Sequence, residues 1–319
     1  MKALEMVGPR KSRIIDVPDL EPGPGQVLVK VKYTGVCMSE WHQWVDARPG
    51  ARMGHEPIGT VAALGEGVKG FQIGERVTGL SSTPTYAEYC LFQQENLVHV
   101  PDNLRDEDAI AEPLSCLISA ASKLRIEKAG DTVAVVGTGY MGLGMVSLFR
   151  LQGAGKIIGV DPRPIARENA LRFGASEVYA PDEVPDKYLV TEWNSEMMIK
   201  GIPIVSEFAG TEDALKLAGD MTAVHGTLGV GGWHQGGMRT VDFKLWGWKG
   251  IIINNTHERR TAFQVECCRN ALDLLSKGIW NFKGLSTHIY GLDEFDRANE
   301  DLISKPNNFI KALIRCSDW

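Results

Sequence analysis

The chain has 319 residues, of which 44% are hydrophobic and 23% are charged, and its formal net charge is −6. This length suits two domains, and this composition is typical of a globular protein with a full core. The negative charge and the lack of a clustered basic stripe argue against nucleic acid as a partner. The first residues lack the apolar stretch of a signal peptide, and the six cysteines form no CxxC pair. We therefore expect a reducing, cytoplasmic setting and no membrane partner.

Short β-strands are predicted for about the first 110 residues. Such runs, among them QVLVKVKY and IGTVAALG, are rich in valine and isoleucine and are separated by turn signals such as EPGPG. This pattern is typical of an irregular barrel or sandwich. From residue 131 onward, strand and helix signals alternate instead, in DTVAVVG, MGLGMVSLFRLQGA, KIIGVD and PIARENALRFGA. Such alternation predicts a parallel sheet with helices on both faces.

Further strand signals follow in IPIVSEFAG, AVHGTLGVGG and KGIIINN, and they extend the predicted parallel sheet. After residue 258 the pattern predicts one helix in FQVECCRNALDLLSKG and a last strand in FIKALIR.

A glycine-rich loop marks the first turn of the predicted parallel sheet. Gly137, Gly139 and Gly142 form GxGxxG directly after a strand, and the motif opens a helix that contains Tyr140 and Met141. The first glycine permits a tight turn, the second lets the backbone approach a pyrophosphate, and the third lets helix and strand pack closely. The start of the helix then faces the phosphate charge. The loop therefore predicts a dinucleotide site.

An acidic residue closes the next predicted strand. Asp161 would accept hydrogen bonds from the adenosine ribose hydroxyls and would repel a 2′-phosphate, which favours NAD over NADP. Arg163, two places on, keeps NADP as the alternative. A glycine turn that binds no nucleotide is the remaining interpretation of this region.

Three residues with metal-binding side chains stand close to predicted strands. Cys37 follows a strand, His55 precedes one in MGHEPIGTV, and Glu112 lies among apolar residues in AIAEPLSC. Cysteine, histidine and glutamate together suit a borderline-soft divalent ion such as Zn²⁺, and three protein ligands leave a fourth position open. Cys116 is the alternative to Glu112 as the third ligand.

These motifs make the chain resemble the zinc-dependent medium-chain dehydrogenase/reductase family, which includes alcohol and sorbitol dehydrogenases. The family's Cys-x-Ser/Thr-Asp-x-His segment is matched by residues 37–42, and its Gly-His-Glu by residues 54–56. The Glu-Pro of its sorbitol-dehydrogenase-like branch is matched at residues 112–113, and a Trp-Lys-Gly before an apolar strand recurs at residues 248–250. The chain departs from the pattern where Met38 and Glu40 replace the usual glycine and aspartate.

The resemblance implies an α/β fold in two domains. A GroES-like, β-rich catalytic domain would comprise residues 1–115 and 256–319, and a Rossmann domain with a doubly wound parallel sheet would comprise residues 116–255. The four-cysteine lobe that often holds a structural zinc has no counterpart, so we expect one catalytic zinc per chain and no structural zinc. The resemblance also implies a homodimer or homotetramer, joined through the strand predicted over residues 249–254.

The resemblance further implies hydride transfer from an alcohol to NAD. The implied zinc ligands are Cys37, His55 and Glu112. Zinc would acidify the substrate hydroxyl, as it acidifies bound water. Ser39 and His42 would then carry the proton through a ribose hydroxyl to solvent. Glu56 would either orient the metal site or act as an alternate ligand, and we favour the first role.

The family lays the nicotinamide against a segment that Val230, Gly231 and Gly232 match, and its terminal basic residue near the pyrophosphate is matched by Lys311. A Cys-His-Glu site resembles the polyol branch, so we expect a secondary alcohol of a sugar, polyol or cyclitol as the small polyhydroxylated substrate. The candidate residues for the wall of the cleft are Trp41, Trp44, His234 and residues 254–258, and an ordinary polar turn is the alternative for residues 254–258. The rival interpretations are an NADP-linked zinc dehydrogenase of another substrate class, a zinc-free quinone or enoyl reductase, and a non-catalytic nucleotide-binding protein.

Overall fold

The computed structural model describes residues 1–306 and 308–317. The chain forms two compact units, of which unit 1 combines residues 1–116 with residues 259–319 and unit 2 comprises residues 117–258. The boundaries expected from the sequence lay after residues 115 and 255. Within the described residues, no helix is both long enough and apolar enough to cross a membrane.

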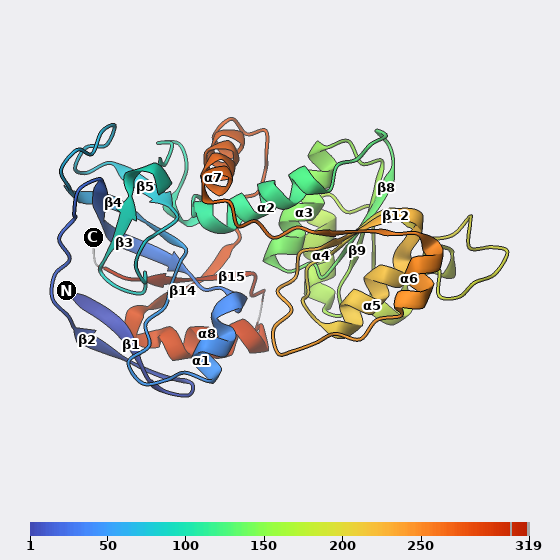
Figure 1. The fold of residues 1–319 in the computed structure, drawn as a ribbon, viewed down its shortest axis with the longest axis horizontal. Helices are drawn as coiled ribbons and strands as arrows, with labels where there is room; N and C mark the ends of the chain where they lie inside the picture. Colours follow the sequence, from blue (N-terminus) through green and yellow to red (C-terminus); the bar gives the residue numbers. More distant parts are fainter. Residues whose placement is uncertain (307, 318–319) are drawn as a thin grey trace. The chain divides into compact units, whose positions relative to one another are not determined.

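Unit 1 is built on a sheet of seven strands to which distant parts of the sequence contribute (Figure 1). The strand order is β14-β15-β3-β4-β5-β7, and β6 pairs with β3. The strands are β3 (Gln26–Gly35), β4 (Pro57–Leu64), β5 (Arg76–Gly79), β6 (Tyr89–Gln93), β7 (Leu97–His99), β14 (Ser286–Gly291) and β15 (Lys311–Arg315). β15 runs parallel to β14 and antiparallel to β3, with Ile314 opposite Thr34. A separate hairpin is formed by β1 (Lys2–Gly8) and β2 (Lys11–Asp16).

The core of unit 1 follows from the alternation of side chains along β3. Val27, Val29 and Val31 are fully buried, because every second side chain of a strand faces the same side of the sheet. They pack in a cluster that also contains Phe92 of β6 and Phe295. The helices of this unit are α1 (Trp41–Val45), the first part of α2 (Ala111–Lys123), α7 (Thr261–Ser276) and α8 (Phe295–Ser304).

Unit 2 contains the parallel sheet that the alternating signals predict, and this prediction is confirmed. The sheet order is β10-β9-β8-β11-β12-β13. The strands are β8 (Thr132–Val136), β9 (Lys156–Val160), β10 (Glu177–Tyr179), β11 (Ile202–Glu207), β12 (Thr222–Val230) and β13 (Ile252–Asn255), and the helices are α3 (Tyr140–Leu151), α4 (Pro164–Arg172), α5 (Glu212–Met221) and α6 (Phe243–Lys249). The chain reverses its direction of winding between β8 and β11, the place where such sheets bind ligands.

The strand predicted over residues 249–254 is wrong at its start. Lys249 is the last residue of α6, and Gly250 ends the helix in the left-handed conformation with φ of 59°. The Lys249 side chain is fully buried and donates to the carbonyl oxygen of Gly219 in α5 at 2.5 Å. This contact holds Lys249 at the end of α6. The strand β13 begins later and is the last strand of the sheet, with 56% of the Ile252 side chain exposed.

Candidate active site

Cys37, His55 and Glu56 come together at one end of the unit 1 sheet. Cys37 follows β3, and the other two residues directly precede β4, which pairs antiparallel with β3. The sulfur, an imidazole nitrogen and a carboxylate oxygen all lie within 4.8 Å of one another. Across residues 1–306 and 308–317, this is the one group of three such side chains close enough to hold a metal ion.

Glu40 fixes the orientation of His55. The two side chains meet at 2.8 Å through His55 Nδ1 and Glu40 Oε1, and the same oxygen accepts from Gly54 N at 2.7 Å. Tyr86 donates its hydroxyl to the other oxygen at 2.9 Å, and Glu40 is buried. A carboxylate on Nδ1 leaves Nε2 for a metal and makes it a better ligand. Sequence reasoning missed this role, although the signal was an acidic residue three places after the proposed metal ligand Cys37.

The neighbours of His55 favour its charged form. Burial alone would lower the pKa of His55, but hydrogen bonds to Cys37 and Glu40 outweigh burial and raise the pKa to about 12. Protonated His55 thus carries a positive charge beside the carboxyl groups of Glu40 and Glu56. A divalent cation bound through Nε2 would supply the same positive charge, since metal binding releases such protons. The donor set of sulfur, nitrogen and oxygen therefore fits Zn²⁺.

Lys311 provides a second positive charge beside this group. Its Nζ lies 2.5 Å from Glu56 Oε2 and donates to the Val36 carbonyl oxygen at 3.0 Å. Burial raises the pKa of Glu56, but Lys311 and His55 outweigh burial and lower it below its ordinary value. Glu56 is therefore ionised, and both roles expected for it remain predictions. The expected contact of Lys311 with a pyrophosphate also remains a prediction.

Glu112 is not a member of this group of three. It stands in the first turn of α2 and accepts a hydrogen bond from Cys116 Sγ at 3.6 Å, one helical turn later. Burial raises the pKa of Glu112 to about 7 and raises that of Cys116 well above its usual range. Burial makes ionisation of this carboxyl group unfavourable, and a bound cation would stabilise its ionised form. The assignment of Glu112 as third ligand thus stays a prediction.

Ser39 and His42 both lie on the short segment that follows Cys37. The Ser39 hydroxyl donates to Cys37 Sγ at 3.2 Å, so it sits directly beside the proposed metal ligand. His42 is 39% exposed in its side chain, and its Nδ1 lies 3.3 Å from Asp46 Oδ2. The expected proton path requires one residue beside the proposed metal ligand and one that is open to solvent. Ser39 and His42 meet these two requirements.

The two tryptophans of this segment differ from the expectation. Trp44 is only 1% exposed and donates its indole N–H to Asp296 at 3.0 Å, so it belongs to the core of unit 1 and does not line a cleft. Its placement there follows from the helix α1, which turns Trp44 inward. Trp41 is partly buried and packs edge-on against His42, with ring centroids 4.7 Å apart. Trp41 therefore remains a candidate cleft residue.

The glycine loop in unit 2 has the geometry that its sequence predicts. Gly137 follows β8 with φ of 88°, a conformation that favours glycine. A Cβ atom on Gly142 would collide with the carbonyl oxygen of Gly137, so only glycine permits this close contact of helix and turn. Gly139 caps α3, whose first residues are Tyr140 and Met141. The open start of this helix suits a pyrophosphate.

Asp161 closes β9 and is already engaged by its neighbours. Its Oδ1 accepts from Arg163 N and Nε, both at 3.0 Å. Its Oδ2 accepts from Thr138 N at 3.0 Å and from Arg163 Nη2 at 3.2 Å. The side chain of Asp161 is only 5% exposed. Ribose hydroxyls would therefore have to replace Arg163 on this carboxylate, a relationship that the sequence pattern did not reveal.

The nicotinamide segment, defined here as Val230–Gly232, begins at the last residue of β12. The backbone N–H groups of Gly231 and Gly232 both donate to the carbonyl oxygen of Glu207 at 2.8 Å. His257 Nε2 lies 3.4 Å from the carbonyl oxygen of Gly232. The segment is thus held in place by hydrogen bonds to β11 and to the stretch after β13.

Residues 254–258, expected as part of the cleft wall, are bound to the end of α2, and their place in a cleft stays a prediction. Lys123 Nζ donates to the carbonyl oxygens of Thr256 at 3.3 Å and His257 at 2.5 Å. It also forms an ion pair with the buried carboxylate of Glu258 at 3.5 Å. Much of this stretch therefore serves the packing of unit 2.

Comparisons with known proteins decide the family. A family model described as an alcohol dehydrogenase GroES-like domain matches residues 23–102, and one described as a zinc-binding dehydrogenase matches residues 141–277. A sorbitol dehydrogenase of Halalkalibacterium halodurans is 30% identical over 93% of this chain and 93% of its own length. The chain belongs to the zinc-dependent medium-chain dehydrogenase family.

Other members of this family show the range of proteins that share the fold. An L-threonine 3-dehydrogenase of Pyrococcus horikoshii is 28% identical over 90% of each chain. A zinc-binding dehydrogenase from Sinorhizobium meliloti 1021 bound to NADP is 25% identical and superposes with a TM-score of 0.81 over 98% of each chain. The chain thus belongs to a family of zinc-binding oxidoreductases of the alcohol and polyol dehydrogenase type.

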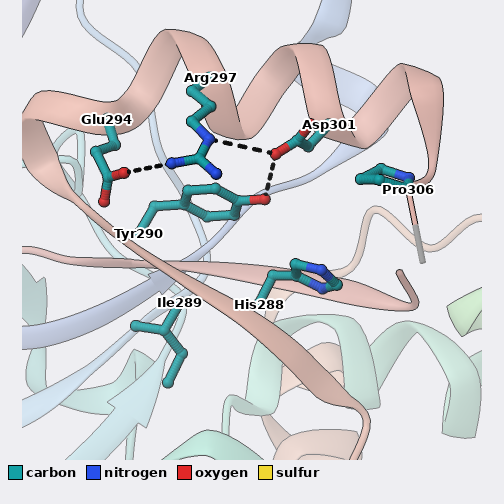
Figure 2. A pocket seen from close by; sticks show the side chains of 7 residues that line it. All are labelled: His288, Ile289, Tyr290, Glu294, Arg297, Asp301 and Pro306. Carbon is teal, nitrogen blue, oxygen red and sulfur yellow. Dashed lines mark hydrogen bonds and ion pairs between the residues drawn. The ribbon is translucent and has the colours of Figure 1, made fainter. Parts of the chain in front are cut away.

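A pocket of about 370 Å³ also lies between β14 and α8 of unit 1 (Figure 2). Figure 2 shows Arg297 reaching Glu294 on one side and Asp301 on the other, and the two distances are 3.0 and 3.8 Å. Tyr290 donates its hydroxyl to Asp301 at 2.7 Å. Arg297 is thus shared between the two carboxylates of this pocket, and we assign the pocket no ligand.

Proposed function

We propose that the protein oxidises a secondary alcohol of a sugar, polyol or cyclitol with NAD, and that it uses one zinc ion per chain. The observation that carries this proposal is the group of Cys37, His55 and Glu56 with the Ser39 hydroxyl on its sulfur. A structural zinc site is closed by four protein ligands, whereas the three proposed ligands, Cys37, His55 and Glu112, leave a position for substrate.

Cys37, His55 and several residues near them each have a part in the proposed reaction. Zinc held by Cys37, His55 and Glu112 would supply positive charge that acidifies the substrate hydroxyl. Ser39 accepts the proton that this hydroxyl releases, and His42 passes it to solvent, since an imidazole changes charge near neutral pH. Glu40 keeps the His55 ring in the orientation that binds metal.

The cofactor assignment rests on the end of β9. The carboxylate of Asp161 would bind the ribose hydroxyls and oppose the charge of a 2′-phosphate, which supports NAD. Arg163 supports NADP, as does the relative that was solved with NADP. We favour NAD, because Asp161 stands directly after β9 and is fixed there by Thr138.

The substrate class rests on the relatives and on the residue types of the metal site. A sorbitol dehydrogenase is among the most similar proteins, and the glutamate-containing ligand set resembles that branch. An amino-acid substrate is the alternative, because L-threonine dehydrogenases are similar to nearly the same extent. We also propose a cytoplasmic location and a homodimer or homotetramer, with no nucleic acid or membrane as partner.

Metal analysis of the purified protein, followed by a panel of substrates, tests this function. We expect about one zinc per chain. We also expect NAD-dependent oxidation of at least one compound among linear polyols, inositols and sugar glycosides, and less with NADP. Oxidation of L-threonine alone would contradict the substrate class. A zinc-free protein that reduces quinones or enoyl compounds would contradict the proposed reaction.

A further inference from the structure

A fully buried carboxylate lies in the middle of the parallel sheet and has no part in the chemistry described above. Glu207 is the last residue of β11, and its side chain has no exposed surface. In the sheet, β11 lies between β8, which leads into the glycine loop, and β12, which leads into the nicotinamide segment. Glu207 is therefore flanked by both loops that are expected to hold the dinucleotide.

Four backbone N–H groups donate to this residue. Oε1 accepts from Ala209 N and Gly210 N, both at 2.6 Å. The backbone carbonyl oxygen accepts from Gly231 N and Gly232 N, both at 2.8 Å. Glu207 thus ties the turn after β11 to the nicotinamide segment after β12.

The same turn also touches the glycine loop. A Cβ atom on Gly137 would come within 2.6 Å of Ala209 N, and one on Gly232 within 2.7 Å of Glu207 Oε2. Both distances are too short for a side chain, so Gly137 packs directly against the turn and Gly232 packs directly against the Glu207 carboxylate. The two cofactor loops therefore meet at the turn that Glu207 holds.

Hydrogen bonds assign the proton of the histidine that completes this arrangement. Arg239 Nε lies 3.3 Å from His234 Nδ1, and an arginine can only donate, so Nδ1 is the acceptor. The ring proton of neutral His234 is then on Nε2, which donates to Glu207 Oε2 at 2.9 Å. Arg239 is held in turn by the carbonyl oxygens of Met238 and Gln235. The relay therefore runs from a guanidinium through an imidazole to a carboxylate.

The carboxylate depends on these donors to remain ionised. Burial raises the pKa of Glu207, and the hydrogen bonds from Gly210 and Ala209, together with His234, offset only part of this increase. Because an ionised carboxylate accepts on both oxygens, it can hold the turn and the imidazole at the same time. Loss of one donor would weaken all the hydrogen bonds to the Glu207 carboxylate.

We propose that Glu207 is a positioning residue for the nicotinamide half of the cofactor, and that His234 and Arg239 form the relay that holds its carboxylate. This inference rests on the proposed function, since it concerns the same dinucleotide. The adenosine half is held elsewhere, by the glycine loop and the end of β9. Damage to the relay should therefore misplace the nicotinamide and leave the adenosine half bound.

The first test replaces Glu207 by glutamine. In Glu207→Gln the amide oxygen can still accept from the turn, but the amide NH₂ faces the N–H of His234 and the two donors repel. We expect kcat to fall on the order of tenfold to a hundredfold, because small misplacements of reacting atoms cost this much. The fluorescence enhancement of bound NADH should fall as well. ADP-ribose, which lacks the nicotinamide, should bind within about twofold of the unmodified protein.

A second replacement provides a rescue that a purely structural role would not show. Arg239→Ala in the Glu207→Gln background frees His234 Nδ1 to carry the ring proton, so that Nε2 can accept from the new amide. We expect the double variant to regain several-fold of the lost kcat. Glu168→Gln on the exposed face of α4 is the matched control and should alter neither kcat nor NADH fluorescence.

His234 offers an independent pair of variants in case Glu207→Gln does not fold. His234→Gln can donate to Glu207 and accept from Arg239, whereas His234→Ala can do neither. We expect the alanine variant to lose NADH fluorescence and the glutamine variant to keep most of it.

Two results would overturn the inference. One is a Glu207→Gln protein with unchanged kcat and NADH fluorescence, and the other is an equal loss of ADP-ribose and NADH binding. Binding of NADH and ADP-ribose needs no alcohol. The binding tests can therefore contradict the inference while the proposed alcohol oxidation stands. They can also support the inference when no alcohol is oxidised.

Discussion

Arg163 holds Asp161 by two side-chain hydrogen bonds, from Nε to Oδ1 at 3.0 Å and from Nη2 to Oδ2 at 3.2 Å. The residue expected to select NAD is thus paired with the residue expected to bind the phosphate of NADP. Whichever dinucleotide binds must change this pair. A ribose would take the carboxylate from the arginine, and a 2′-phosphate would take the arginine from the carboxylate.

The two members of this pair should therefore shift cofactor choice in opposite directions. Asp161→Ser should weaken NAD and improve NADP, because it removes the ribose acceptor and frees Arg163. Arg163→Ala should leave NAD at least as good and worsen NADP. Hydrogen bonds to charged groups contribute roughly 1.5–3 kcal/mol, so each ratio should shift on the order of tenfold to a hundredfold. The measurement is kcat/KM for both cofactors, and an unmodified protein that prefers NADP would contradict the assignment.

Replacing Cys37 by serine tests the metal site. Cys37→Ser removes the thiolate ligand, so we expect loss of zinc and of alcohol oxidation. Dinucleotide binding should persist, because the glycine loop belongs to unit 2. Metal analysis and a titration of NADH fluorescence measure the two effects separately. A variant that keeps full zinc content and turnover would show that Cys37 is not a ligand.

Glu40 should control zinc affinity without binding zinc. Glu40→Gln keeps the size of the side chain but removes the charge that orients His55 Nδ1. Outer partners of this kind contribute about tenfold to a hundredfold to metal affinity. Competition with a chelator measures the change. Tyr86→Phe removes only one donor to Glu40 and should have a smaller effect, so equal effects of the two variants would contradict this role.

The last strand of the parallel sheet should mediate self-association. Ile252 and Ile253 of β13 are 56% and 43% exposed at an edge of the sheet, where an unpaired apolar strand invites another strand. We expect a dimer in which β13 pairs with its copy, and Ile252→Lys should shift the protein toward monomer. Sedimentation at micromolar concentration measures this. A stable monomer of the unmodified protein would exclude the dimer.

Lys249 should make stability depend on alkaline pH. Burial lowers the pKa of Lys249 to about 8, against an ordinary value of 10.5. Between these two values the unfolded chain binds the proton and the folded chain does not, so the unfolding free energy rises with pH. Relative to Lys249→Met, the unmodified protein should therefore gain up to about 3 kcal/mol from pH 8 to 10.5. Denaturant unfolding at several pH values measures the difference, and a constant difference would contradict it.

Local patterns predicted most of the secondary structure. The alternation in β3 and the strand–glycine–helix order around Gly137 depend on a few neighbouring residues, so a sequence carries them directly. Lys249 is different, because its position at the end of α6 depends on carbonyl groups of α5 that lie far away in the sequence. The strand predicted there covers the apolar run, but it starts at residue 249, whereas β13 starts at Ile252.

The site was predictable in its residue types and less so in its contacts. Cys37 and His55 could be paired through the spacing of a known family. The hydrogen bond between Glu40 and His55, and the clamp of Arg163 on Asp161, depend on the direction of side chains in space. Trp44 shows the same limit, since only the turn of α1 decides that it enters the core rather than a cleft.

The position of β15 within its sheet bears on how the protein is made. β15 is flanked by β14 and β3, and its first residue, Lys311, contacts Glu56. During translation the strands of unit 2, which are contiguous in the sequence, leave the ribosome well before β15 does. Domains fold as units in the order of their synthesis, and contacts between distant segments form late. Zinc loading in the proposed form should thus follow the synthesis of residue 311, since a nascent chain that ends before this residue lacks the cation beside Glu56.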